Sequence, residues 1–75
     1  MPRLPALKPR QIIRALESAG FFVHHQTGSH VQLKHRAKPG LRVTVPAHTV
    51  DVPRHVVQSI LRQAEMSTDD FLKLL

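Results

Sequence analysis

The sequence predicts an α+β fold of the order α-β-β-β-α, in which helices cover one face of a three-stranded antiparallel sheet. This prediction follows from an apolar pattern of helical period near each end of the chain and three short strand-like segments between them. The 75 residues suffice for one domain, spanning residues 1–75. Residues 1–7 are expected to form an irregular lead-in, to which no role is assigned.

The first expected helix covers about residues 9–19. Pro9 suits its first position, because the missing N–H of a proline loses no hydrogen bond there. Apolar residues follow at helical spacing, at Ile12, Ile13, Leu16 and Ala19. Gly20 stands where helices commonly end in the left-handed conformation, so we expect the helix to end just before it.

Three short strands are expected at residues 21–27, 30–36 and 41–45. The first is rich in strand formers, and the other two alternate between apolar and polar residues, as half-buried strands do. Gly28-Ser29 and residues 37–40 leave room only for tight turns, and Pro46 ends the third strand. Strands joined by turns this short must pair antiparallel.

The alternation in the second and third strands assigns their side chains to two faces. The apolar set, which the helices are expected to cover, is Val31, Leu33, Leu41, Val43 and Val45. The polar set on the opposite face is His30, Gln32, Lys34, Arg36, Arg42 and Thr44. A register slip of one residue would bury the whole polar set, so the pattern predicts one exposed, basic sheet face.

A loop at residues 47–52 leads to a second helix, which Pro53 begins, with Asp51 near its positive end. Its apolar stripe is Val56, Val57, Ile60, Leu61 and Ala64. Ser67 is expected to cap a last short helix, with Asp69 and Asp70 in its first turn. The residues expected to dock this helix are Phe71, Leu72 and Leu75.

The charge of the chain, +6 overall, is unevenly distributed. Residues 1–62 hold ten Lys and Arg against two acids, a net charge of +8, whereas residues 63–75 hold one Lys and three acids. A body this basic favours a polyanionic partner. The chain has no cysteine, no apolar segment long enough for a membrane span and no sign of a secretion signal, so we expect a cytoplasmic protein.

Gly28-Ser29-His30, at the start of the second strand, resembles the signature of the HicA (YcfA-like) toxin family of toxin–antitoxin pairs. The resemblance covers about residues 8–75. Its other landmarks are Ala19-Gly20-Phe21, Val43-Thr44-Val45-Pro46 with His48, residues 59–64, and the closing Ser67 with Phe71-Leu72. The chain departs from the family at Glu65, where a glycine is usual at the left-handed end of a helix.

The resemblance implies a fold like that of double-stranded-RNA-binding domains (dsRBD-like), and a ribonuclease that cleaves mRNA and arrests translation. It also implies that His30 is catalytic and that a HicB-type antitoxin neutralises the protein. An imidazole suits this chemistry, since RNA carries its own 2′-hydroxyl nucleophile and needs only proton transfer and charge stabilisation. On this hypothesis Gly28, Ser29, Lys34, Arg36 and Arg42 bind the RNA, and Lys8, Arg10 and Arg14 extend the basic track.

Several residues also have ordinary structural interpretations. His30 can be a surface histidine that only hydrogen-bonds a phosphate, and Ser29 can cap the turn. A second proton-transfer group, if there is one, is His24, His48 or water. Phe21, Phe22 and Phe71 are expected in the core. A metal site is disfavoured, because adjacent His24 and His25 should face opposite ways and zinc needs three or four converging ligands. No cofactor is expected.

Two other functions compete with the ribonuclease hypothesis. One is a non-catalytic RNA-binding module that uses the same basic face and leaves RNA intact. The other is a protein-interaction domain whose basic face meets an acidic partner. The three hypotheses differ in whether the purified protein cleaves RNA, only binds it, or does neither.

Overall fold

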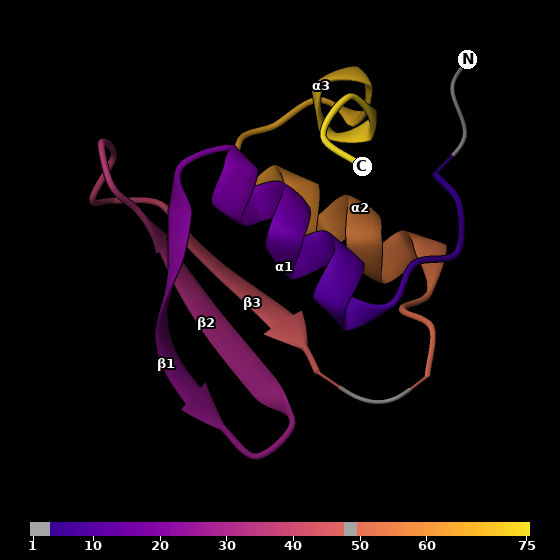
Figure 1. Ribbon diagram of the computed structural model, residues 1–75, viewed down its shortest axis with the longest axis horizontal. Coiled ribbons are helices and arrows are strands. Elements are labelled where there is room, and N and C mark those ends of the chain that lie inside the picture. Colours follow the sequence, from indigo (N-terminus) through magenta and orange to yellow (C-terminus); the bar gives the residue numbers. More distant parts are fainter. Residues whose placement is uncertain (1–3, 48–49) are drawn as a thin grey trace.

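The computed structural model describes residues 4–47 and 50–75. Its helices and strands follow the predicted order, so the fold class is α+β (Figure 1). The elements are α1 (Pro9–Ser18), β1 (Phe21–Thr27), β2 (His30–His35), β3 (Arg42–Pro46), α2 (Arg54–Gln63) and α3 (Thr68–Leu72). The strands form one antiparallel sheet of order β1-β2-β3. The predicted bounds of the strands are right to within one residue at each end.

Helix α1 begins and ends where the sequence predicts. Pro9 occupies its first turn, and the Gln11 side chain accepts a hydrogen bond from the Lys8 backbone N–H at 2.9 Å. At the other end Gly20 has a φ of +101°, and its N–H donates to the Glu17 carbonyl at 3.0 Å. This left-handed glycine reverses the chain directly into β1.

The β1–β2 connection is a two-residue hairpin of Gly28 and Ser29. Gly28 has a φ of +50°, as the first central position of a type II′ turn requires. This turn type matches the twist of the paired strands, and it fixes a register in which Thr27 pairs with His30. The turn therefore sets the side of the sheet to which His30 belongs.

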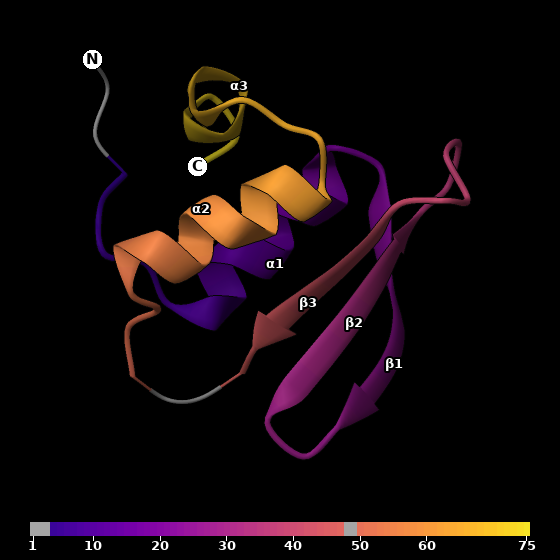
Figure 2. The ribbon, with the colours of Figure 1, turned by 180° about the vertical axis from the view of Figure 1, so that it is seen from behind.

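Figures 1 and 2 show α1 and α2 on the same side of the sheet. The core lies between them and the sheet, and the predicted face assignment is confirmed. The buried strand residues are Val31, Leu33, Val43 and Val45, each 3% exposed or less. Leu41 is half-buried and packs against the core from just outside β3. Ile12, Leu16, Val57 and Ile60 meet these residues from the helices.

The lead-in before α1 contributes to the core, which the sequence did not predict. Leu4 and Leu7 are each only 3% exposed. The Val52 N–H donates to the Leu7 carbonyl at 2.7 Å and forms an isolated bridge. The segment before α1 is thereby tied to the segment before α2. The burial of these leucines could not be predicted from the sequence, because the segment contains prolines and has no regular apolar period.

Helix α2 ends in a Schellman motif that contains a non-glycine residue. The Met66 N–H donates to the Leu61 carbonyl at 3.0 Å, and the Glu65 N–H to that of Arg62 at 3.1 Å. Glu65 has a φ of 54°, so the left-handed position expected there exists without glycine.

Helix α3 follows as predicted, and Ser67 Oγ accepts a hydrogen bond from the Asp70 N–H at 3.1 Å. Phe71 is fully buried, but the prediction that Leu75 docks is wrong, since Leu75 is 51% exposed. Because α3 ends at Leu72, the helical period stops, and Leu74 packs against the core instead. No helix in residues 4–47 and 50–75 is long and apolar enough to cross a membrane.

Candidate functional site

Polar side chains gather on the side of the sheet away from the helices, which we call the outer face. The strand register arranges its residues in three rows that cross β1, β2 and β3. The rows are Thr27, His30 and Pro46; His25, Gln32 and Thr44; and Phe22, Lys34 and Arg42. The predicted site residues His30, Lys34 and Arg42 therefore share one face, as the alternation requires.

A β-bulge in β1 alters which histidines reach the outer face. Val23 pairs with Leu33 and His25 with Gln32, so His24 is an extra residue on β1. Val23 and Gln26 border a hollow on the helix side, whereas His24 borders one on the outer face. The expectation that His24 and His25 face opposite ways is therefore wrong, because the bulge places two consecutive residues on the same side.

His30 is the exposed first residue of β2, directly after the hairpin turn. Ser29 Oγ lies 3.4 Å from Nδ1 of His30. When the ring carries its proton on Nδ1, the ring donates to the hydroxyl in this contact, and the lone pair of the ring is on Nε2. The Ala47 N–H donates to the Ser29 carbonyl, which ties the turn to the chain after β3. The backbone around His30 is thus held from both sides.

Gly28 serves the turn rather than close packing. A Cβ built at Gly28 would meet no atom within 4 Å, so the surrounding space does not require glycine. The φ of +50° does favour it, because side-chain-bearing residues rarely adopt that conformation. The glycine therefore shapes the hairpin that presents Ser29 and His30.

Lys34 and Arg42 lie opposite each other, two rows from His30. Together with His24, Gln32 and Thr44 they border a shallow depression of about 290 Å³. Lys34 follows His30 by four residues along β2, roughly 13 Å at about 3.3 Å per residue. At that separation these cations are placed to hold a phosphate further along a bound strand than the one beside His30.

Arg36 follows β2 directly, and its guanidinium lies over the Phe22 ring, 5.5 Å from the ring centroid. Phe22 is half-buried and pairs with Lys34, so it belongs to the outer face. The prediction that Phe22 lies in the core is therefore wrong. Phe21 and Phe71, at 3% and 0% exposure, are core residues as expected.

His35 has a structural role at the other end of β2. Its Nε2 donates to the Ala19 carbonyl at 2.9 Å, and its Nδ1 accepts from the N–H groups of Ala37 and Lys38 at 3.0 and 3.2 Å. The ring also packs edge-on against Phe21, with centroids 4.8 Å apart. Both nitrogens are engaged with the backbone, so His35 is not available for proton transfer to a ligand.

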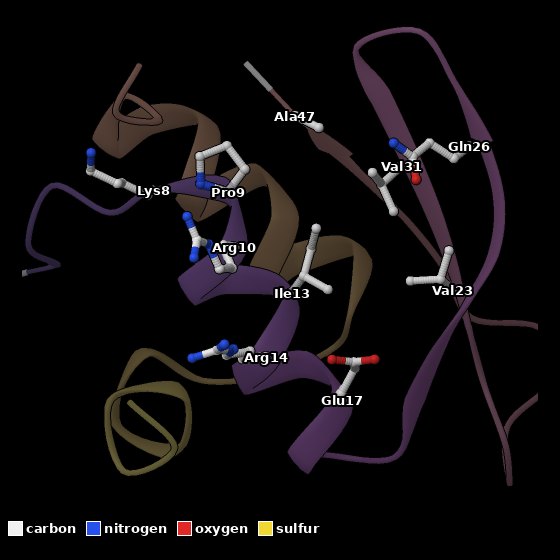
Figure 3. A pocket seen from close by; sticks show the side chains of 10 residues that line it. All are labelled: Lys8, Pro9, Arg10, Ile13, Arg14, Glu17, Val23, Gln26, Val31 and Ala47. Atoms are coloured by element: carbon white, nitrogen blue, oxygen red, sulfur yellow. The ribbon is translucent and has the colours of Figure 1, made fainter. Parts of the chain in front are cut away.

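A hollow of about 610 Å³ lies on the helix side of the hairpin, between α1 and the strands (Figure 3). Ile13, Val23 and Val31 point into it, and Lys8, Arg10 and Arg14 lie along its α1 side. These cations stand on the side of the sheet opposite His30, so they do not extend the outer-face track. Its lining contains one carboxylate and no histidine, which gives it little capacity for acid–base chemistry.

No three His, Cys, Asp or Glu residues in the described part of the chain are grouped so that they could hold a metal ion. The outer face gathers His24, His25 and His30 on one surface without such grouping. His48, the other histidine considered for proton transfer, lies outside the described residues. Sequence reasoning missed the placement of His25 and Phe22, for which the only signal was that residues 21–27 do not alternate.

Fold and outer face define a small, basic α+β protein whose polar groups lie on an open sheet. The family model for the HicA toxin of bacterial toxin–antitoxin systems matches residues 9–66, which include all of the outer face. The chain belongs to the HicA toxin family. Membership gives it a toxin role within a toxin–antitoxin pair and implies an antitoxin as its partner. No curated protein matches the chain.

Proposed function

We propose that this protein is a metal-independent endoribonuclease toxin that cleaves mRNA, and so inhibits translation, with His30 as a general acid–base group. The observation that carries the proposal is the exposed imidazole of His30 at the end of an open, basic sheet face. Membership in a toxin family supports it, because cleavage of mRNA arrests growth. The proposed place of action is the cytoplasm, where mRNA is translated.

The chemistry asks little of the protein beyond proton transfer. Nε2 of His30 takes the proton of a ribose 2′-hydroxyl, and the resulting oxygen attacks the adjacent phosphorus. The bond from phosphorus to the 5′-oxygen then breaks, leaving a 2′,3′-cyclic phosphate and, once that oxygen is protonated, a 5′-hydroxyl. General acid–base catalysis of this kind contributes roughly 10²–10⁴-fold to the rate. The contact between Ser29 Oγ and Nδ1 supports the orientation of the ring.

The RNA is proposed to run along the outer face from the hairpin turn toward the far end of β2. Gly28 and Ser29 border the scissile phosphate, and Lys34 and Arg42 bind a phosphate two rows away. The guanidinium of Arg36 over Phe22 offers a further cation with a flat surface for a base. These contacts are to backbone and stacked bases, so this part of the face supports binding without strong sequence preference.

The antitoxin partner is proposed to be of the HicB type and to contact the basic outer face. A partner on that face would exclude RNA and cover His30 at the same time. An acidic surface on the antitoxin would match the cations at Lys34, Arg36 and Arg42. Neutralisation then needs no change in the toxin, because the face is open and rigidly supported by the core beneath it.

The test compares wild type with His30→Ala, both purified and incubated with a structured mRNA fragment in a metal chelator. We expect wild type to cleave the RNA and His30→Ala to lose cleavage by at least about 100-fold. Binding of the RNA and the melting temperature should stay close to wild type, because His30 is exposed and outside the core. Induction in cells should show growth arrest only with wild type.

A non-catalytic RNA-binding module is the alternative, because Lys34 and Arg42 lie two rows from His30 and can bind phosphates without any chemistry there. Under that alternative both proteins bind RNA equally well and leave it intact. Cleavage that survives His30→Ala would contradict the assignment of His30.

A further inference from the structure

Cleavage by this route needs two proton transfers at one phosphate. One group removes the 2′-hydroxyl proton, and another protonates the departing 5′-oxygen on the far side of phosphorus. One imidazole cannot readily serve both atoms in a single turnover, since they lie on opposite sides of the reacting centre. We infer that His25 is the second group, the general acid; this inference rests on the proposed function.

The strand register brings His25 next to His30. Thr27 pairs with His30 and His25 pairs with Gln32, so His25 and His30 are diagonal neighbours on the outer face. Diagonal neighbours on one face of an antiparallel pair have Cα atoms about 7–8 Å apart. Two imidazoles at that separation can approach one phosphate from two sides.

The bulge at His24 is the reason that His25 lies on the outer face beside His30. Without the extra residue, strict alternation would place at most one of two adjacent histidines on the outer face. With it, His24 and His25 both reach that face, and His25 takes the row nearer to His30. Bulges commonly re-aim side chains next to active sites. His25 is exposed, as a group that must reach a bound phosphate requires.

The other described histidines are worse placed. His24 borders the depression beside Lys34 and Arg42, further along β1 from the hairpin turn. His35 holds backbone groups with both ring nitrogens. His55 lies in α2, on the side of the sheet away from the outer face. His25 is therefore the described histidine that the fold brings closest to His30 on the same face.

The roles follow from the part that the proposed function gives to His30. There His30, whose Nδ1 contacts Ser29 Oγ, accepts the 2′-hydroxyl proton, so the group still required is an acid. His25, protonated before the reaction, gives its proton to the 5′-oxygen as the bond to phosphorus breaks. After one cleavage His30 carries the extra proton and His25 lacks one. Exchange with water restores both, so no co-reactant is consumed.

The test uses a short RNA that wild type cuts at one mapped site, prepared in two forms. One form is ordinary RNA, and the other has sulfur in place of the bridging 5′-oxygen at that site, so that the leaving thiolate needs no proton. His25→Ala should cleave ordinary RNA at least about 100-fold more slowly than wild type, yet cleave the sulfur substrate at nearly the wild-type rate. His25→Gln should behave in the same way, because an amide cannot replace the acid.

His30→Ala should be slow on both substrates, since the 2′-hydroxyl still needs a base. His55→Ala is the matched control and should equal wild type on both. The inference is overturned if His25→Ala cleaves ordinary RNA normally, if its defect is equal on the two substrates, or if His24→Ala shows the rescue instead. These results leave the proposed function intact, whereas wild type that cuts no RNA overturns both.

Discussion

Two residues hold a left-handed conformation at the end of a helix, and only one of them is glycine. Gly20 has a φ of +101°, and a Cβ there would lie 2.7 Å from Nε2 of His35, so both conformation and space require glycine. Glu65 has a φ of 54° at the end of α2, where the Schellman hydrogen bonds hold it. The second position therefore carries a strain that the first avoids.

Glu65→Gly should stabilise the protein. A left-handed conformation costs a residue with a side chain roughly 1–2 kcal/mol, and glycine removes this cost. Part of the resulting stabilisation is lost again, because glycine also raises the conformational entropy of the unfolded chain. We expect the free energy of unfolding to rise by about 0.5–1 kcal/mol, measured by urea denaturation. Gly20→Ala is the opposing control and should destabilise. A loss of stability in Glu65→Gly would show that the glutamate side chain contributes a contact that outweighs the strain.

At the scale of elements, His35 links three parts of the fold. Its ring joins the end of α1, the edge of Phe21 in β1 and the turn after β2. The Arg36 N–H strengthens the same junction by donating to the Gly20 carbonyl at 3.0 Å. On the other edge of the sheet, Gln63 of α2 accepts from the Thr44 N–H at 3.0 Å and covers part of β3. The α1–β2 junction and the β3 edge are therefore fixed by side chains, whereas β1 is an exposed edge.

His35→Ala should weaken folding without touching the proposed chemistry. Removing the ring leaves the Ala19 carbonyl and two N–H groups without this partner, which costs roughly 1–3 kcal/mol. The loss should appear as a lower urea midpoint, while the rate of RNA cleavage per folded molecule stays close to wild type. His55→Ala, on an exposed part of α2, should change the midpoint little. If His35→Ala loses cleavage while fully folded, its assignment as a structural residue is wrong.

At the scale of the whole molecule, the helices and the core lie on one side of the sheet and the outer face lies on the other. Beneath the outer face the strand residues are buried, so the polar side chains stand on a packed support. The cations of α1 lie on the helix side, beside the large hollow. The basic body that the composition suggested is thus divided between two surfaces, and only one of them contains His30.

The affinity for RNA should fall steeply as the salt concentration rises, because cations of the outer face contact RNA phosphates. Each phosphate contact adds roughly 0.7–0.9 to the slope of log K against log salt concentration. Lys34→Ala with Arg42→Ala should weaken binding and lower the slope by about 1.4–1.8. The slope is measured by fluorescence anisotropy of labelled RNA across a salt series. Lys73→Ala removes one positive charge in the acidic end of the chain, and it is the control for the loss of a single charge. An unchanged slope in the double variant would move the RNA to another surface.

The sequence alone determined the order of elements, the ends of α1 and the faces of β2 and β3, because these depend on local rules. Apolar period, turn-forming glycines and prolines, and alternation act over a few residues and can be read one segment at a time. They placed His30, Lys34 and Arg42 on one face. The left-handed position at Glu65 was expected from the family resemblance and not from these local rules.

Only the tertiary structure decided the rest. The bulge at His24 arises from pairing two strands of unequal length, so no single segment encodes it, and it turned His25 toward His30. The burial of Leu4 and Leu7 depends on contact with a segment more than forty residues away in sequence. The role of His35 and the separation of the α1 cations from the outer face likewise depend on how the layers pack. Local patterns determine to which face of its strand a side chain belongs. Distances between elements depend on how the helices and the sheet pack together, which no single segment determines.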